Sequence, residues 1–171
     1  MIALENKVTE NKVAFIGKVK TISTALQIDP SWLMGIMYHE SGLNHRIENS
    51  IGAVGLIQFM PDTAAGLGTS KTALKAMSNV QQLDYVYKYF KPSAGRFKSA
   101  YDLFAYSFLP LAVGKPDTWV FETSRLPASI IAKQNPGFDI NKDGKITIAE
   151  YKAYLRKWFV KNGIDPEKKS L

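Results

Sequence analysis

Cysteine is absent from the 171 residues of this chain, and histidine occurs only twice. Without cysteine no disulfide can hold the fold together, so the fold depends on its packed core, helped at most by a bound metal ion. His39 and His45 lack a third ligand at suitable spacing, so we do not expect a zinc site. Hydrophobic residues make up 46% of the chain, which is typical of a globular protein. The length suffices for one domain with a sizeable core, or for one domain plus a small appendage.

Long apolar runs are also missing. The segment from Met1 to Lys20 is interrupted by charged residues and lacks the apolar stretch that a secretory signal needs. No other stretch is long and apolar enough to cross a bilayer. We therefore expect a protein without membrane insertion that is made in the cytoplasm and relies on another component to carry it elsewhere.

Positive charge is in excess and unevenly distributed. The net charge is +7, and the region between Ser70 and Ala100 contains six basic residues against one acid, Asp84. A basic face suits a polyanionic partner such as nucleic acid, anionic lipid or bacterial cell wall, although a solvated lysine-rich surface is the commoner case. The chain has no helix-turn-helix or RNA-binding signature, so we do not expect nucleic acid to be the partner.

Helical patterning dominates, which predicts a mainly α fold. The predicted helices cover about residues 15–26, 30–41, 61–67, 79–91, 100–109, 127–134 and 148–161. The helix at 100–109 is the most hydrophobic and is our candidate for the buried centre of the domain. Gly52 and Gly55 lie in an irregular segment, where residues 52–59 predict a short extended turn or hairpin.

Glu40 is the first candidate functional residue. Asp29 and Pro30 form a good helix start, and Gly42 is a plausible C-cap. An apolar stripe at helical spacing leads up to Glu40 and consists of Leu33, Ile36 and Met37. An inward position and the negative end of the helix dipole would both favour the protonated carboxyl, which is the form of a general acid. The alternative is a glutamate at the rim of the stripe that reaches water.

A second candidate site lies near the C-terminus. Residues 139–150 match the twelve-residue calcium loop of EF-hand proteins, with Gly144 where the loop turns sharply. The predicted calcium ligands are Asp139, Asn141, Asp143, the backbone carbonyl of Lys145, Thr147 through a water molecule, and Glu150. Because only one such loop is visible, we interpret it as a structural staple rather than a paired sensor. We predict a main domain at residues 1–126 and an EF-hand-like calcium segment at residues 127–171 on the same globule.

Three short motifs resemble those of the soluble lytic transglycosylases. They are Glu40-Ser41 at a helix end, Gly55-Leu56-Ile57-Gln58, and Ala105-Tyr106 on a later helix. The resemblance covers roughly residues 25–114 and implies a lysozyme-like fold related to goose-type lysozyme. The sequences at residues 58–61 and 110–115 are also similar to cell-wall-cutting domains of bacteriophage virion or tail proteins.

The resemblance implies specific roles for these residues. Glu40 would be the sole acid and base, cleaving the bond between N-acetylmuramic acid and N-acetylglucosamine in peptidoglycan and leaving a 1,6-anhydro ring. Ser41 and Gln58 would line the glycan cleft, and the Tyr106 hydroxyl would orient the glutamate. Ser107 replaces the asparagine that usually follows the third motif, which puts one substrate or backbone contact in doubt.

Two other functions remain open from the sequence. A muramidase, which hydrolyses the same bond, would require a second carboxylate to activate water, and Glu48 and Asp62 are the nearest acids in the sequence. A non-catalytic, calcium-stabilised module would instead bind glycan or assemble with other virion or tail proteins. We expect the protein to reach the bacterial wall as a phage virion component or as a lysin.

Overall fold

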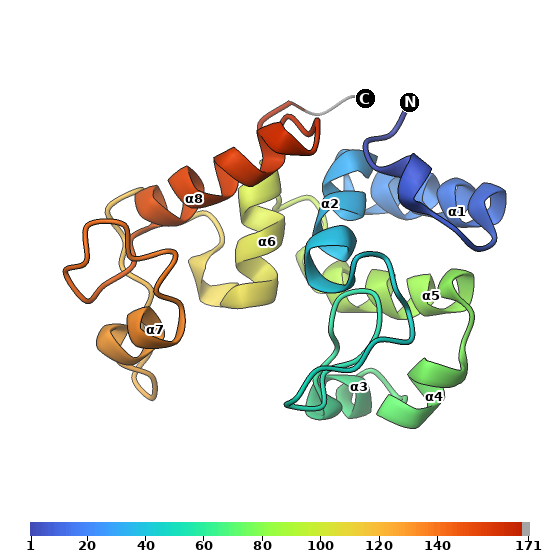
Figure 1. Cartoon of the computed structure of the whole chain (residues 1–171), viewed down its shortest axis with the longest axis horizontal. Helices are drawn as coiled ribbons and strands as arrows, with labels where there is room; N and C mark the ends of the chain where they lie inside the picture. The colour runs from blue at the N-terminus through green and yellow to red at the C-terminus, as the bar shows by residue number, and fades with distance from the viewer. Residues whose placement is uncertain (169–171) are drawn as a thin grey trace. The chain divides into compact units, whose positions relative to one another are not determined.

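The computed structural model describes residues 1–168, and these form two compact units, residues 1–95 together with residue 168, and residues 96–167 (Figure 1). Helices are the main element of both units, as the sequence predicts. The predicted domain boundary after residue 126 falls inside the second unit, and the division into domains at that point stays a prediction. None of the helices in the described residues is long and apolar enough to cross a membrane.

The first unit is built around a central helix. Its helices are α1 (Lys12–Leu26), α2 (Pro30–Ser41), α3 (Pro61–Gly66), α4 (Lys71–Ala76) and α5 (Asn79–Phe90), with 3₁₀ turns at Glu5–Lys7 and Lys91–Ser93. Helix α1 packs against both α2 and α5. Every residue of α2 from Trp32 to Met37 is buried, so this helix forms the core on all its faces. The sequence predicted the helix at 100–109 as the buried centre of the domain. That helix belongs to the second unit, and the buried centre of the first unit is α2.

The segment between α2 and α3 is irregular. Val54 and Phe59 exchange two backbone hydrogen bonds of 3.0 and 2.8 Å, and Val54 also forms an isolated bridge with Glu48. These bridges confirm the predicted short turn, although no regular β-strand forms in the described residues between the two helices. The segment passes close to α5, because the Leu56 amide donates to a side chain of that helix.

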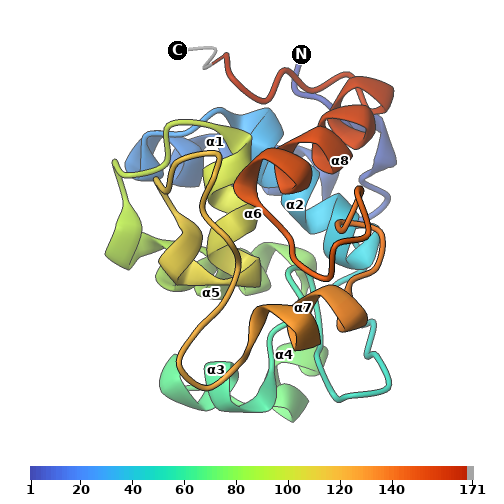
Figure 2. The same ribbon diagram turned by 90° about the vertical axis from the view of Figure 1, so that its left-hand side faces the viewer.

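The second unit packs its helices through aromatic side chains. Its helices are α6 (Ala100–Phe108), α7 (Ala128–Gln134) and α8 (Ile148–Lys161), with a 3₁₀ turn at Pro110–Ala112. Helix α8 crosses α6 (Figure 2). The rings of Phe104 and Phe159 join the two helices, with centroids 4.9 Å apart. Phe108 stacks on Tyr151 at 5.8 Å, which joins the end of α6 to the start of α8. Aromatic pairs of this kind add to the stability gained by burying their area.

Candidate active site

Local capping places Glu40 at the end of α2. The Asp29 side chain accepts a hydrogen bond of 2.7 Å from the Ser31 amide, and Pro30 occupies the first turn. Gly42 ends the helix in the left-handed conformation, with φ of 62°. Glu40 is therefore the last residue but one of the helix, as the sequence predicts.

The side chain of Glu40 is partly exposed. Thirty per cent of its side-chain surface remains accessible, and Nδ1 of His39 lies 3.7 Å from its Oε1. The neighbouring Met37 and Ser41 are buried. Glu40 thus lies at the rim of the apolar stripe rather than inside it, and its carboxyl reaches the surface.

Ser41 fixes the end of α2 to the irregular segment. Its buried hydroxyl lies 2.9 Å from the carbonyl oxygen of Met37 and 3.0 Å from that of Leu56. A hydroxyl has one proton to donate, so the two carbonyls share it. The bond to Leu56 ties the residue next to Glu40 to the irregular segment, and the predicted contact of Ser41 with glycan stays a prediction.

Gln58 closes the turn that begins at Gly55. Its backbone amide donates to the Gly55 carbonyl at 3.0 Å, and its side-chain Nε2 donates to the same carbonyl at 3.1 Å. Gln58 has φ of 52°, the left-handed region that is costly for a residue with a side chain. The turn presents a partly exposed amide, which suits the predicted contact with a sugar hydroxyl.

Gln82 of α5 is a buried polar residue near these motifs that the sequence analysis did not single out. Its fully buried amide donates to the carbonyls of His45 and Leu74 and accepts from the Leu56 amide. A Cβ on Gly55 would clash with its Oε1, so only glycine fits there. The sequence offered one signal for this role, which is a glutamine next to Leu83 on the apolar side of a capped helix. A glutamine in that position is buried, and a buried amide requires hydrogen-bond partners.

Glu48 is held by two lysines of α4. Its Oε1 lies 2.6 Å from Lys71 Nζ, and its Oε2 lies 2.8 Å from Lys75 Nζ. Hydrogen bonds from Lys71 and Lys75 lower the pKa of Glu48 to about 2. A carboxylate with so low a pKa is a weak base, so Glu48 is a poor choice for activating water.

The other acids of the first unit mostly have structural partners. Asp29 caps α2, Glu10 pairs with Arg46 at 3.0 Å, and Asp84 pairs with Lys18 at 2.8 Å. Glu5 accepts a hydrogen bond of 3.2 Å from the Ile2 amide. Asp62 lies exposed in the first turn of α3, where the helix dipole favours its charge.

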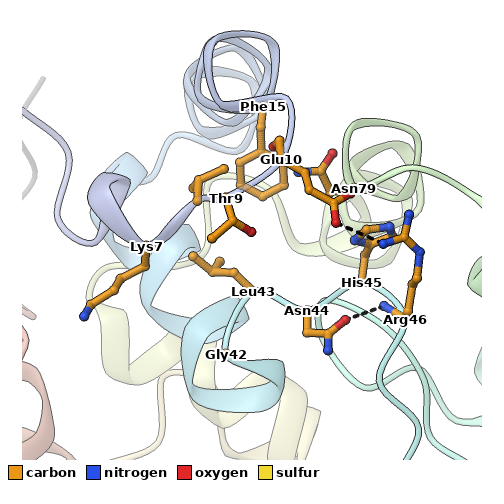
Figure 3. A pocket seen from close by; sticks show the side chains of 11 residues that line it. Lys7, Thr9, Glu10, Phe15, Gly42, Leu43, Asn44, His45, Arg46 and Asn79 are labelled. Carbon is orange, nitrogen blue, oxygen red and sulfur yellow. Dashed lines mark hydrogen bonds and ion pairs between the residues drawn. The ribbon is translucent and has the colours of Figure 1, made fainter.

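A cavity of about 370 Å³ lies between the N-terminal segment and the residues that follow α2 (Figure 3). Lys7, Thr9, Asn44 and His45 are among the residues that line it, and Glu40 does not belong to its lining. The Nε2 atom of His45 is buried and finds no hydrogen-bond partner within the described chain. Burial is the main cause that lowers the pKa of His45, so the ring is held in its neutral form.

Tyr106 and Ser107 lie on α6 in the second unit. The Tyr106 ring packs edge-on against Phe97, with centroids 5.5 Å apart, and is partly exposed. The Ser107 hydroxyl is buried and makes no hydrogen bond among the described residues. The predicted action of Tyr106 on Glu40 stays a prediction.

The predicted calcium loop adopts a tight turn around its own carboxylates. The Asp139 carboxylate accepts hydrogen bonds from the amides of Asp143 and Gly144, at 3.2 and 3.0 Å. Gly144 has φ of 81°, which explains the need for glycine at this position. The loop is also tied to an earlier segment, because the Phe121 amide donates to the Ile146 carbonyl at 2.9 Å.

Glu150 links the calcium loop to α8. Its Oε2 accepts hydrogen bonds from the amide and hydroxyl of Thr147, at 3.0 and 2.8 Å, which completes a capping box. Burial would raise the pKa of Glu150, but hydrogen bonds from Thr147, Asn141 and Ile140 outweigh it and lower the pKa. The carboxylate is therefore ionised, as a calcium ligand must be.

The donor set of the loop suits a hard cation such as calcium. The side chains at the predicted ligand positions Asp139, Asn141, Asp143 and Glu150 offer only oxygen as a ligand atom, as a hard cation prefers. Within residues 1–168, no group of three or more histidine, cysteine, aspartate or glutamate side chains is arranged to hold a metal ion. Calcium binding stays a prediction that rests on the motif and on the fold of the loop.

The chain matches the sequence model of a known protein family. The sequence model described as "Transglycosylase SLT domain" matches residues 18–107, which is more than half of the chain. This chain belongs to the SLT transglycosylase family. The matched region contains Glu40, Ser41, Gln58 and Tyr106, whereas the calcium loop lies outside it. The helical structure agrees with the lysozyme-like α fold of the family, and the family's activity is lytic cleavage of peptidoglycan.

Proposed function

We propose that this SLT protein is a lytic transglycosylase that uses Glu40 as its only acid and base and leaves 1,6-anhydro-muramic acid ends. The observation that carries the proposal is the setting of Glu40. Its carboxyl is accessible at the end of a buried helix, and the adjacent Ser41 is bound to the turn that contains Gln58. Among the acids of the first unit, the others except Asp62 are bound to an amide or a cation.

The chemistry requires one carboxyl in two states. Protonated Glu40 gives its proton to the oxygen that links the muramic acid to the glucosamine, and the bond from C1 to that oxygen breaks. The carboxylate of Glu40 then removes the proton of the sugar's C6 hydroxyl while O6 bonds to C1. The proton returns to Glu40, and no water is consumed.

A single-carboxylate mechanism is supported by the state of Glu48, the nearest candidate for a second catalytic carboxylate in the sequence. An inverting hydrolase places its base roughly 6.5–9.5 Å from its acid to leave room for a water molecule. Glu48 is occupied by Lys71 and Lys75, and its pKa of about 2 makes it a weak base. Asp62 is the remaining candidate base among the acids of this unit.

Mass spectrometry of the released fragments tests the proposal. Purified peptidoglycan is treated with the wild type and with Glu40→Gln, whose folding is checked by circular dichroism. We expect fragments with anhydro ends from the wild type and none from the variant. Reducing-end fragments, heavier by one water, would identify a muramidase and direct attention to Asp62. No fragments from either folded protein would favour the non-catalytic glycan-binding or assembly module.

We also propose that the loop at residues 139–150 binds one calcium ion as a structural staple. Asp139, Asn141, Asp143 and Glu150 would supply side-chain oxygens, Lys145 a backbone carbonyl and Thr147 a water-mediated contact. The support is the motif, the turn at Gly144, and the bond from Phe121 to Ile146. When bound, calcium would stabilise the start of α8 through Glu150.

The route to the wall is a further proposal. We infer that the protein acts on the bacterial cell wall as a component of a phage virion or tail, in contact with other virion proteins, or as a lysin. The support is the sequence similarity at residues 58–61 and 110–115 alone. Proteomic detection of the chain in purified particles would favour the virion role, and its absence from them would favour the lysin.

A further inference from the structure

The amide of Gln82 is buried in the first unit with all three of its strong contacts in place. Nε2 lies 2.5 Å from the His45 carbonyl and 2.7 Å from the Leu74 carbonyl, and Oε1 lies 3.0 Å from the Leu56 amide nitrogen. The two donors face two acceptors, and the acceptor faces a donor, which fixes the orientation of the amide. A carboxylate at this position would face two carbonyl oxygens.

These contacts join four segments of the first unit. His45 follows α2, Leu74 lies in α4, Leu56 lies in the irregular segment, and Gln82 itself belongs to α5. The approach is tight, because a Cβ on Gly55 would clash with both Oε1 and Nε2 of Gln82. The position of the Gln82 amide therefore requires glycine at residue 55.

Leu56 connects the Gln82 amide to the residue next to Glu40. Its amide is bound to Gln82, and its carbonyl is bound to the hydroxyl of Ser41, the residue next to Glu40. Leu56 is fully buried, so water does not replace either bond. Leu56 also belongs to the turn at Gly55, and the Gln58 side chain is bound to the Gly55 carbonyl in that turn.

We propose that Gln82 is a positioning residue for the reaction, acting through Leu56 and Ser41 on Glu40 and through the Gly55 turn on Gln58. This inference rests on the proposed function of Glu40. Its loss would let the irregular segment move relative to α2 without removing any group that touches substrate. A displacement of about 1 Å at a reacting group costs on the order of a hundredfold in rate, so we expect kcat to fall about ten- to a hundredfold.

The test compares Gln82→Leu with a matched control, Gln81→Leu. Gln81 is exposed on the same helix, and its side chain accepts a capping bond of 2.9 Å from the Ser78 amide, so its loss destabilises α5 without touching the irregular segment. With soluble glycan strands, at a temperature where both variants are folded, we expect kcat to fall for Gln82→Leu and to stay near the wild type for Gln81→Leu. A folded Gln82→Leu with wild-type kcat would overturn the proposal, as would an equal fall in both variants.

Gln82→Glu keeps the test decisive if Gln82→Leu does not fold. A protonated carboxyl can accept from the Leu56 amide and donate to one carbonyl, whereas the ionised form faces two carbonyl oxygens. We expect the ratio of its kcat to the wild-type kcat to rise as the pH falls. A ratio that stays constant with pH would count against a positioning role.

Hydrogen exchange separates this inference from the proposed function. The Leu56 amide is expected to be strongly protected in the wild type and in Gln81→Leu, and to exchange much faster in Gln82→Leu. If the wild type released no fragments, the proposed function would fail, and the exchange result would still decide whether Gln82 holds the segment. Unchanged protection in Gln82→Leu would overturn the inference whatever the activity.

Discussion

Glu48 Oε1 lies 2.6 Å from Lys71 Nζ, which ties the irregular segment after α2 to helix α4. Lys75 binds the other oxygen of the same carboxylate at 2.8 Å. Two of the basic residues counted between Ser70 and Ala100 are thus paired with an acid from outside that range. The basic region is correspondingly less available to an anionic wall polymer than the sequence count indicates.

Glu48→Gln is predicted to leave the reaction products unchanged. The carboxylate is too weak a base to activate water, so its loss removes no catalytic group. The variant and the wild type are compared by mass spectrometry of the released sugars, with Glu40→Gln as the inactive control. A wild type that makes reducing-end sugars, together with an inactive but folded Glu48→Gln, would contradict the prediction and make Glu48 the base.

The same variant is predicted to change acid stability in a defined direction. The folded pKa of about 2 lies below the ordinary value of 4.5, so Glu48 stabilises the fold above pH 4.5 and loses this effect as the pH falls towards 2. Between these values the wild type is expected to lose stability more steeply than Glu48→Gln. The difference is expected to shrink in high salt, because both lysines are partly exposed. Equal slopes at low salt would show that the pairing adds nothing to stability.

The position of Glu40 along α2 could be predicted because its determinants are local. Asp29, Pro30 and Gly42 carry their capping signals within one helix, and each acts as the sequence indicates. The exposure of Glu40 could not be predicted, since a stripe position next to Met37 is compatible with either the core or its rim. In the structure, the Glu40 side chain lies at the rim of the apolar stripe.

The role of Gln82 could not be predicted for a different physical reason. Its partners Leu56 and His45 lie 26 and 37 residues away in the sequence, and no short motif records such a contact. Gly55 was recognised as part of a motif, but its close approach to Gln82 only becomes visible in three dimensions. Contacts between buried polar groups that are distant in the sequence therefore could not be predicted from the sequence alone.

His45 is predicted to make the fold sensitive to mild acid. Its side chain is buried, with 3% of the residue exposed, and its Nε2 lacks a partner in the described structure. Burial and the charge of Arg46 lower its pKa below 6.5, while Glu10 opposes them. A group with a lowered folded pKa stabilises the fold above its unfolded pKa and stops doing so as the pH falls through the folded value.

The measurement is the melting temperature between pH 7.5 and pH 5. We expect the wild type to lose stability over this range and His45→Leu to lose less, because the variant has no imidazole to protonate. His39→Gln removes the other histidine, which is exposed, and is expected to keep most of the wild-type pH dependence. If His39→Gln flattened the profile and His45→Leu did not, His45 would not be the sensitive group.

Calcium is predicted to raise the melting temperature through the loop at residues 139–150. Free calcium at a hundredfold excess over its dissociation constant would stabilise the folded state by about 2.7 kcal/mol. Glu150→Gln removes the closing carboxylate and is expected to abolish most of the shift, whereas Glu122→Gln alters an exposed acid outside the loop and is expected to retain it. The calcium proposal would be contradicted if calorimetric titration of the wild type with calcium showed no heat of binding and calcium did not change its melting temperature.

Ser41→Ala is predicted to destabilise the fold more than it weakens substrate binding. The hydroxyl is buried and bonds to the carbonyls of Met37 and Leu56, so its loss leaves a buried acceptor unpaired at a cost of about 1–3 kcal/mol. For a chain of this size, each kcal/mol lowers the melting temperature by about 2–4 °C. The same restraint reaches Glu40, so kcat is expected to fall while KM stays close to the wild type.

Thr24→Ala is the control for Ser41→Ala, because the Thr24 hydroxyl makes a similar bond of 3.1 Å to a helix carbonyl but is exposed on α1. It is expected to change neither the melting temperature nor kcat substantially, since water replaces a lost bond at the surface. A large rise in KM for Ser41→Ala, with its melting temperature unchanged, would assign the hydroxyl to the substrate. It would then place Ser41 among the residues that bind glycan, as the family resemblance implies, rather than among those that hold Glu40 in place.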